Sequence, residues 1–462
     1  MTLIKSISGI RGTIGGAPGD ALTPVDVVKF AAAFGTWAKA HGAKKIVIGR
    51  DARPSGEMVS QLVSATLQGL GLHVIDLGLS TTPTVEIAVP LEKAGGGIIL
   101  TASHNPVQWN ALKLLNEKGE FISAEDGAEV LQLAQKDNFD FAAVTQLGSY
   151  TQNNSYIQKH INLILKHKLV DKRAIQNSKF KIAVDAVNST GGIAVPLLLK
   201  ALGVKKIVQL YCEPTGKFPH NPEPLPEHLK KITSVVKKEK CHLGIVVDPD
   251  VDRLALIQED GNPFGEEYTL VAVADYILKK KKGNTVSNLS STRALRDVTE
   301  QAGGEYRAAA VGEVNVVNKM KEVKAVIGGE GNGGVIVPDF HYGRDALMGI
   351  ALFLSHLAKS KLKASELRKS YPAYFISKNK IELTPQINVD QVLDKMKLKY
   401  AHENINTVDG VKIDFEKEKE WVHLRKSNTE PIIRIYAESQ NEKKAAALAQ
   451  RIISDIKNII GK

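Results

Sequence analysis

Residues 45–56 read KIVIGRDARPSG, an apolar β-rich run that passes into a small, polar loop and then into a helical period. A second copy of this arrangement lies at residues 182–192, and a weaker third copy lies at 285–294. Apolar runs of this length that alternate with helices indicate βαβ units and a largely parallel sheet. Copies spaced by roughly 100–140 residues are too far apart for a solenoid, so they indicate three related α/β domains.

The last part of the chain follows another pattern. Beyond Tyr371-Pro372, short strands precede one long terminal helix, which is typical of an α+β domain. We therefore expect an α/β protein with three related α/β domains and a smaller α+β domain at the C-terminus. The expected domains are residues 1–155, 156–257, 258–370 and 371–462.

Apolar spacing and N-terminal signals such as Thr23-Pro24 predict individual helices within these domains. The predicted helices are residues 23–39, 123–136, 345–358 and 442–459. Residues 150–154 are polar, and we expect them and the segment near Asn177 to bracket a helical linker into the second domain.

The composition excludes several classes of function. The net charge of +11 comes mostly from dispersed lysines, and neither zinc-finger spacing nor a ribonucleoprotein motif accompanies it, so we expect phosphorylated metabolites rather than nucleic acid as partners. We find no run of 18 apolar residues and no apolar core of a secretory signal at the N-terminus, so we expect no membrane partner. Cys212 and Cys241 lack metal-ligand spacing, which fits a cytoplasmic protein. The sequence gives no oligomeric state.

One hydroxyl group stands out after the predicted strand at residues 97–100. It belongs to the loop Thr101-Ala102-Ser103-His104-Asn105-Pro106, which Pro106 keeps from continuing as a helix. No Gly-x-Ser-x-Gly elbow surrounds Ser103, so acyl transfer of the α/β-hydrolase kind is not indicated. Ser103 is therefore expected to be a nucleophile or a phosphate carrier.

Three carboxylates follow the buried run at residues 243–247, and they stand at alternate positions: Asp248, Asp250 and Asp252. In an extended segment these side chains would share one face, whereas Pro249 offers a bend in the loop. The three negative charges repel one another unless a cation compensates them. Their oxygen atoms suit Mg²⁺, with a phosphate oxygen completing the coordination shell of the ion. A calcium loop is rejected because Arg253 stands where that loop needs glycine. A phosphatase with Asp248 as nucleophile and Asp250 as acid stays open.

Two further loops carry polar groups. Residues 328–334 read GGEGNGG and match a dinucleotide fingerprint poorly, because Glu330 and Asn332 interrupt it and a β-like run follows. Glycines beside one carboxylate and one amide suit sugar hydroxyls. Residues 425–431 read RKSNTEP between two β-like runs and offer a cradle for phosphate. With Ser103 and the three aspartates, these loops fall one in each predicted domain and suggest phosphoryl transfer on a sugar phosphate.

On these motifs the chain resembles the α-D-phosphohexomutase superfamily over essentially its full length. The matching segments are residues 101–106, 248–253, 329–333 and 425–431, in the expected order. The resemblance implies four domains around a central cleft and a Mg²⁺-dependent enzyme. It also implies that hexose 6-phosphate and hexose 1-phosphate interconvert through a phosphoserine and a hexose 1,6-bisphosphate, which also primes the serine.

The resemblance implies roles for particular residues. Ser103 would carry the phosphoryl group, with His104 beside it among the catalytic residues, and Lys113 would be the general acid/base, with its pKa depressed by nearby cations. Arg11 and Arg253 would steady phosphoryl oxygens. The implied metal ligands are Ser103, Asp248, Asp250 and Asp252. The implied substrate-binding residues are Glu330 and Asn332 for sugar hydroxyls, and Arg425, Ser427, Asn428 and Thr429 for the phosphate that is not reacting.

The substrate follows less directly from the sequence. The loop that ends at Gly334 is similar to that of archaeal-type members, which are phosphoglucosamine mutases or phosphoglucomutase/phosphomannomutases, while Asn221-Pro222-Glu223-Pro224 is more similar to the glucose and mannose types. Some members have histidine where this chain has Gly334 and Glu313. We favour glucosamine phosphate, because cell-wall precursor synthesis needs such an enzyme, with glucose and mannose phosphates as alternatives. A sugar-phosphate sensor without turnover is the non-enzyme alternative.

Overall fold

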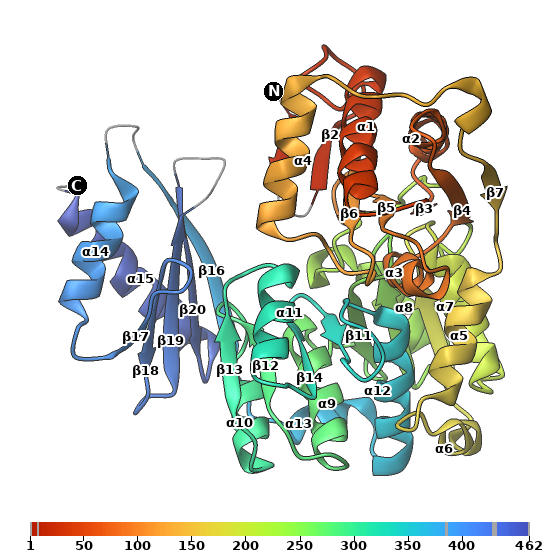
Figure 1. The fold of residues 1–462 in the computed structure, drawn as a ribbon. Coiled ribbons are helices and arrows are strands. Elements are labelled where there is room, and N and C mark those ends of the chain that lie inside the picture. Colours follow the sequence, from red (N-terminus) through yellow and green to blue (C-terminus); the bar gives the residue numbers. More distant parts are fainter. Residues whose placement is uncertain (1, 7–8, 384–386, 427–431, 461–462) are drawn as a thin grey trace. The chain divides into compact units, whose positions relative to one another are not determined.

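The computed structural model describes residues 2–6, 9–383, 387–426 and 432–460, and the chain forms two compact units. Unit 1 comprises Met1–Thr269 and Asn332–Leu367, and unit 2 comprises Leu270–Gly331 and Arg368–Lys462. Figure 1 shows the course of the chain through its helices and strands. Within the described ranges, no helix is both long and apolar enough to cross a membrane.

The first sheet of unit 1 has seven strands in the order β1-β2-β6-β5-β3-β4-β7. Its strands are β1 (Ile4–Ser6), β2 (Gly9–Thr13), β3 (Lys45–Arg50), β4 (His73–Leu79), β5 (Gly97–Leu100), β6 (Trp109–Leu115) and β7 (Tyr150–Gln152). Strands β3, β4, β5 and β7 are parallel, as predicted, whereas β2 and β6 add an antiparallel edge. The helical linker predicted between residues 150–154 and the segment near Asn177 is confirmed as α5 (Tyr156–Lys166) and α6 (Lys172–Ser178), while Tyr150 at its border pairs with Val74 and extends the sheet.

Both faces of this sheet are covered by helices. On β3, Ile46 and Ile48 belong to one apolar core, whereas Val47 between them belongs to a second core on the opposite face. This alternation follows from the two-residue period of a strand. The covering helices are α1 (Pro24–Ala40), α2 (Gly56–Gly69) and α4 (Ala124–Lys136) on the first face and α3 (Thr82–Leu91) on the second.

Local capping signals set the starts of α1 and α4, as the sequence predicted. The Thr23 side chain accepts a hydrogen bond from the backbone of Asp26, while the Asp26 carboxylate accepts one from the backbone of Thr23. Ser123 and Asp126 make the same reciprocal pair at α4. Each pair satisfies N–H groups that the first helical turn leaves without partners.

The second sheet of unit 1 has four strands in the order β11-β10-β8-β9. Its strands are β8 (Lys181–Asp185), β9 (Lys206–Leu210), β10 (Leu243–Val247) and β11 (Leu254–Gln258), of which only β11 is antiparallel to its neighbour. The remaining elements of this part are η1 (Val144–Gln146), α5 (Tyr156–Lys166), α6 (Lys172–Ser178), α7 (Gly191–Ala201), η2 (Pro226–His228), α8 (Lys230–Lys238), β15 (Gly334–Ile336) and α12 (Ala346–Ser360). Asp345 caps α12, where the sequence predicted its start.

Unit 2 contains two sheets. In the first, β12 (Thr285–Asn288) pairs in parallel with β13 (Tyr306–Ala309) and β14 (Ile327–Glu330), and α10 (Ala294–Gln301) and α11 (Glu313–Glu322) pack on these strands. Helices α9 (Glu266–Leu278) and α13 (Ala364–Lys369) span the boundaries between the units.

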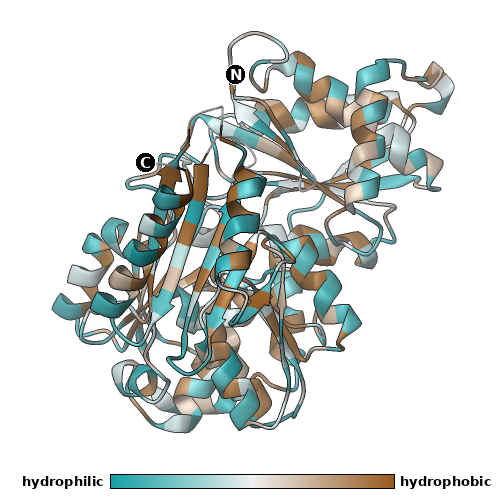
Figure 2. Cartoon of the chain, turned by 90° about the vertical axis from the view of Figure 1, so that its left-hand side faces the viewer, coloured by the Kyte–Doolittle hydropathy of each residue, from teal (hydrophilic) through white to brown (hydrophobic). Residues whose placement is uncertain are grey.

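The C-terminal sheet of unit 2 is antiparallel, in the order β16-β20-β19-β18-β17. Its strands are β16 (Phe375–Glu382), β17 (Asn404–Asn406), β18 (Val411–Phe415), β19 (Glu420–Lys426) and β20 (Ile432–Ser439). Helices α14 (Val389–Lys399) and α15 (Glu442–Ile459) share one apolar core with it. Hydrophilic and hydrophobic residues alternate along the helical ribbons, as expected of helices that cover a sheet on one side (Figure 2). The predicted fold class, α/β domains followed by an α+β unit, is confirmed.

Candidate active site

Ser103 lies three residues beyond the end of β5 and is 7% exposed. Its backbone adopts a left-handed conformation, with φ of 47°, and its N–H donates to the Thr101 hydroxyl at 2.9 Å. The Ser103 hydroxyl donates to Asp248 Oδ2 at 2.7 Å. A non-glycine residue in this conformation is strained and persists only where its surroundings enforce it, so the loop is built to hold this hydroxyl in one place.

Arg53 is the group that fixes the Ser103 loop. Arg53 is 1% exposed, and its guanidinium donates to four backbone carbonyl oxygens, those of Ser103, Asn105 and Pro106 in the loop and that of Trp109 at the start of β6. Its Nε donates to Asp51 Oδ2 at 2.9 Å, and the same oxygen accepts the Thr101 hydroxyl proton at 2.7 Å. A planar fork of N–H donors suits such a set of carbonyl acceptors better than a lysine ammonium does.

The three aspartates lie in a turn after β10 rather than in an extended segment. Val251 has φ of 64°, which reverses the chain between Asp250 and Asp252. The loop is therefore bent, as Pro249 was expected to allow, and the carboxylates still converge. All three are 0% exposed, and one ligand oxygen from each lies within 4.8 Å of the others.

Lys113, Arg344 and the Thr82 hydroxyl hold the carboxylates of Asp250 and Asp252. Lys113 Nζ, on β6, lies 2.7 Å from Asp250 Oδ2 and 3.5 Å from Asp252 Oδ2. The Arg344 guanidinium donates to Asp252 at 2.7 Å, and the Thr82 hydroxyl donates to Asp250 at 2.6 Å. Each cation therefore bridges segments that are far apart in the sequence.

The charges of the cluster are set by burial and by these partners. Burial, followed by the charges of Asp252 and Asp250, raises the pKa of Asp248 well above its ordinary value. Burial acts in the same sense on Asp250, but the Lys113 ammonium outweighs it and holds the pKa of Asp250 below its ordinary value.

The pKa of Lys113 corrects one expectation. Burial lowers it, but Asp250 and Asp252 outweigh burial, so that the pKa of Lys113 is raised rather than depressed. The sequence-based expectation of a lowered pKa assumed that cations surround Lys113. The carboxylates of Asp250 and Asp252 lie next to its ammonium group instead. Lys113 is therefore protonated in the arrangement described here.

The cluster fits a divalent cation. Asp250 Oδ1 and Asp252 Oδ1 are buried oxygens without a hydrogen-bond partner. Such oxygens are costly to bury unless a donor or a cation satisfies them. Three carboxylates with a neighbouring hydroxyl supply the oxygen ligands that Mg²⁺ prefers.

Three further predicted residues belong to the same part of unit 1. His104 Nδ1 lies 3.4 Å from Ser103 Oγ, and burial, helped by Arg253, lowers the pKa of His104 to about 3, so its ring is neutral. The Arg253 backbone N–H donates to Asp248 Oδ1 at 3.1 Å, and its guanidinium lies 3.5 Å from Glu223. Arg11 is exposed on β2 opposite Ala111 of β6. Its side chain therefore projects from the same face of the sheet as that of Lys113.

Glu330 and Arg425 lie in unit 2 and are linked by neighbouring backbone groups. Glu330 Oε1 accepts hydrogen bonds from the Asn288 side chain at 2.8 Å and from the Gly312 N–H at 3.1 Å. The adjacent N–H of Val311 donates to Asp409 Oδ2 at 3.0 Å, and the same carboxylate binds Arg425 Nε at 2.8 Å. Glu330, predicted to bind the sugar, thus contacts Gly312, and Arg425, predicted to bind the phosphate, is connected through Asp409 to the neighbouring Val311.

Four predicted substrate-binding residues remain. Asn332 lies in unit 1, where its side-chain oxygen accepts the Gly334 N–H at 3.2 Å. Ser427, Asn428 and Thr429 lie outside the described residues.

Sequence reasoning missed Asp51, Arg53, Thr82 and Arg344, which contact the predicted residues of unit 1, and Asp409, which contacts Arg425 in unit 2. Arg53 stood within the stretch that predicted the fold, directly after an apolar run, and that position was its one signal. Asp51 stood in the same stretch, two residues before Arg53, whereas Thr82, Arg344 and Asp409 carry no local signal.

Four family models match successive parts of the chain. They are described as phosphoglucomutase/phosphomannomutase alpha/beta/alpha domain I over residues 3–141, domain II over 154–261 and domain III over 265–374, and as the C-terminal domain over 380–454. Together they span most of the chain in the order of the motifs.

Relatives and solved structures agree with these matches. A Thermococcus kodakarensis protein named phosphoglucomutase/phosphomannomutase is 36% identical over 94% of this chain and 95% of its own length. A Sulfurisphaera tokodaii phosphoglucosamine/phosphogalactosamine mutase is 31% identical over 98% of both chains. The crystal structure of a phosphoglucomutase/phosphomannomutase family protein from Burkholderia thailandensis superposes with a TM-score of 0.84, at 26% identity over 98% of both chains. The chain belongs to the α-D-phosphohexomutase superfamily and is a phosphohexomutase, an isomerase of carbohydrate metabolism.

Proposed function

We propose that this chain is a cytoplasmic phosphoglucosamine mutase that interconverts glucosamine 6-phosphate and glucosamine 1-phosphate through phospho-Ser103. The observation that carries the mechanism is the hydrogen bond of 2.7 Å from Ser103 Oγ to Asp248, within three buried carboxylates that contain oxygens without hydrogen-bond partners. This arrangement supports a serine that bears a phosphoryl group beside a divalent cation.

The proposed metal ligands are Asp248, Asp250, Asp252 and an oxygen of phospho-Ser103. Mg²⁺ bound there would neutralise charge on the transferring phosphoryl group, which is the main requirement of such catalysis. A Mg²⁺ complex has been solved for an Aspergillus fumigatus N-acetylphosphoglucosamine mutase, whose fold matches this chain with a TM-score of 0.60 at 14% identity.

The reaction proceeds in two transfers. In the first, the sugar hydroxyl oxygen bonds to phosphorus, the bond from phosphorus to Ser103 Oγ breaks, and the hydroxyl proton leaves with a base. The bisphosphate then turns around, and Ser103 takes the other phosphate in the reverse reaction. A hexose 1,6-bisphosphate charges the serine before the first turnover.

The side chains around Ser103 supply positioning and charge. Arg11 and Arg253 bind phosphoryl oxygens, and Arg53 holds the loop from which the transfer occurs. Lys113 is assigned the proton exchange with the sugar hydroxyl; it is protonated beside Asp250 and Asp252, and it must release that proton before it can accept the one from the hydroxyl. His104, neutral and 3.4 Å from Ser103 Oγ, lies beside the same reacting oxygen.

Substrate binding is assigned to a second group of residues. Glu330 and Asn332 bind sugar hydroxyls, and Arg425, with Ser427, Asn428 and Thr429, binds the phosphate that is not being transferred. Asp409 orients Arg425 for this purpose.

The names of the relatives support glucosamine phosphate, since several archaeal relatives at 30–31% identity are named probable phosphoglucosamine mutases. The second candidate is a phosphoglucomutase/phosphomannomutase, which the name of the relative at 36% identity favours. The test is kcat/KM for the glucosamine, glucose and mannose 6-phosphates under the same conditions. A value for glucosamine 6-phosphate below either of the others would refute the proposed substrate.

The mutase mechanism has its own test, which does not depend on the substrate. The Ser103→Ala variant should lose mutase activity with all three sugars. Full activity in that variant would refute the mechanism, and binding of sugar phosphates without isomerisation by the wild-type chain would favour the sensor.

A further inference from the structure

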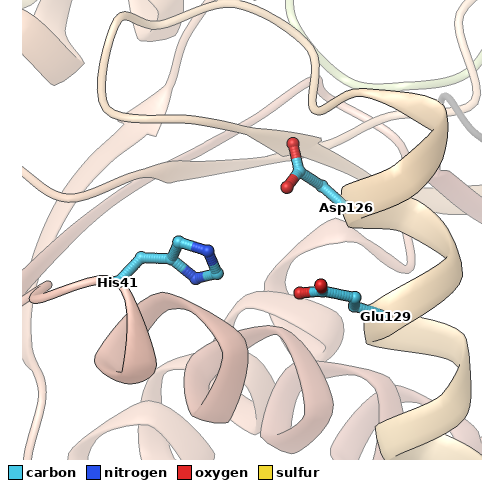
Figure 3. A group of neighbouring side chains, drawn as sticks. All are labelled: His41, Asp126 and Glu129. Carbon is cyan, nitrogen blue, oxygen red and sulfur yellow. The ribbon is translucent and has the colours of Figure 1, made fainter.

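Three potential metal ligands converge on the surface of unit 1, away from the serine and the aspartates. His41 directly follows α1, and Asp126 and Glu129 stand three residues apart near the start of α4. Figure 3 shows the imidazole pointing toward the two carboxylates across the space between these helices. One ligand atom from each residue lies within 4.8 Å of the others.

The His41 ring is held in place by α1. Its Nδ1 lies 2.9 Å from the backbone oxygen of Trp37, and its centroid lies 4.7 Å from the Trp37 ring. Because a carbonyl oxygen only accepts, Nδ1 carries the proton in the neutral ring, and the lone pair of Nε2 remains for a ligand. A backbone carbonyl on one ring nitrogen is the usual support of a histidine that binds metal through the other.

Asp126 is also fixed from outside the cluster. Its Oδ2 accepts the Ser123 N–H at 3.2 Å in the capping box, so its Oδ1 stays available. No ion pair of 4.0 Å or less joins His41 to Asp126 or Glu129, all of which the structure describes. The imidazole and the two carboxylates therefore approach one another without an ion pair between them.

We propose that His41 Nε2, Asp126 Oδ1 and the Glu129 carboxylate bind a transition-metal dication, with Zn²⁺ as the representative ion. Zinc bonds to histidine nitrogen and carboxylate oxygen are about 2.0–2.2 Å long, so small rotations of the exposed Glu129 side chain bring the donors to one ion. The bound ion clamps the end of α1 to the start of α4, and water completes its coordination. One nitrogen donor distinguishes this site from the all-oxygen cluster of aspartates, which suits Mg²⁺.

The test is a calorimetric titration of the full-length chain with Zn²⁺ in excess Mg²⁺, which keeps the aspartates occupied. Wild type is compared with His41→Ala and Glu129→Gln, and with His402→Ala as a matched control that removes another surface histidine, 71% exposed. We expect about one equivalent of Zn²⁺ to bind wild type and His402→Ala, and at least tenfold weaker binding in the other two variants. Melting temperature, measured on the same samples, should rise with Zn²⁺ only in the chains that bind it.

Three results would overturn the proposal. Equal stoichiometry and affinity in all four chains would place the bound Zn²⁺ elsewhere. A loss in His402→Ala as large as that in His41→Ala would indicate general binding by surface histidines. Unchanged binding in Glu129→Gln, an exposed substitution that leaves the capping box intact, would exclude the two-carboxylate site. Mutase activity should be the same in wild type and in the three variants.

Discussion

Replacement of Arg53 tests how far the Ser103 loop depends on one buried side chain. In Arg53→Met, four backbone carbonyls of the loop and the start of β6 lose their donors, and buried Asp51 loses its ion pair at 2.9 Å. Hydrogen bonds from a charged donor contribute about 1.5–3 kcal/mol each, and breaking one buried ion pair costs about 3–5 kcal/mol. Since these terms are not additive and the loop can relax toward water, we expect a loss of about 3–5 kcal/mol in the free energy of unfolding.

The folded Arg53→Met variant should also lose activity, beyond what a smaller folded fraction would explain. A displacement of about 1 Å of the reacting oxygen can reduce kcat roughly 100-fold. Arg53→Lys keeps the charge but lacks the planar fork of donors, so it should recover part of the stability and little of the activity. Stability is measured by urea unfolding, and kcat is measured at a temperature where each variant is fully folded. A kcat within twofold of wild type in Arg53→Met would refute the role of Arg53 as a positioning residue.

Three further predictions concern substrate binding, pH and metal. Asp409→Asn should raise KM about tenfold with little change in kcat, because Asp409 holds Arg425 at 2.8 Å; steady-state kinetics check this, and a change confined to kcat would contradict it. Burial raises the pKa of Glu438 from 4.5 to about 7, so the native chain keeps a proton that the unfolded chain releases, and its stability should fall between about pH 4 and pH 8 by up to roughly 3 kcal/mol. The free energy of unfolding of Glu438→Gln, measured in urea over that pH range, should lack this decline. The same decline in Glu438→Gln as in wild type would contradict the prediction. Mg²⁺ at about 100 times its Kd should stabilise wild type by about 2.7 kcal/mol in thermal unfolding and Asp250→Asn by much less, whereas equal stabilisation would place the metal elsewhere.

The sequence predicted the features that depend on local signals. The capping residues Thr23 and Ser123 mark helix starts through contacts within one turn, and these positions are confirmed. The apolar runs at β3, β8 and β10 predicted buried strands for the same reason. The three aspartates predicted a metal site because crowded carboxylates need compensation wherever the chain turns.

What the sequence could not predict depends on contacts between distant segments. Ser103 and Asp248 are 145 residues apart, and nothing local says that they meet. The direction of the pKa shift of Lys113 was wrong for the same reason, because the expectation placed cations near it and the structure places Asp250 there. Strand β7 was missed because its three residues are exposed and carry no apolar alternation.

The central claim is that Ser103 stores the phosphoryl group. The chain is incubated with a hexose 1,6-bisphosphate labelled with ³²P, treated with hydroxylamine and mapped by mass spectrometry. We predict one label per chain, stable to hydroxylamine, on Ser103, and no label in Ser103→Ala. A hydroxylamine-labile label on Asp248 that survives in Ser103→Ala would contradict the account and identify an aspartyl phosphate instead.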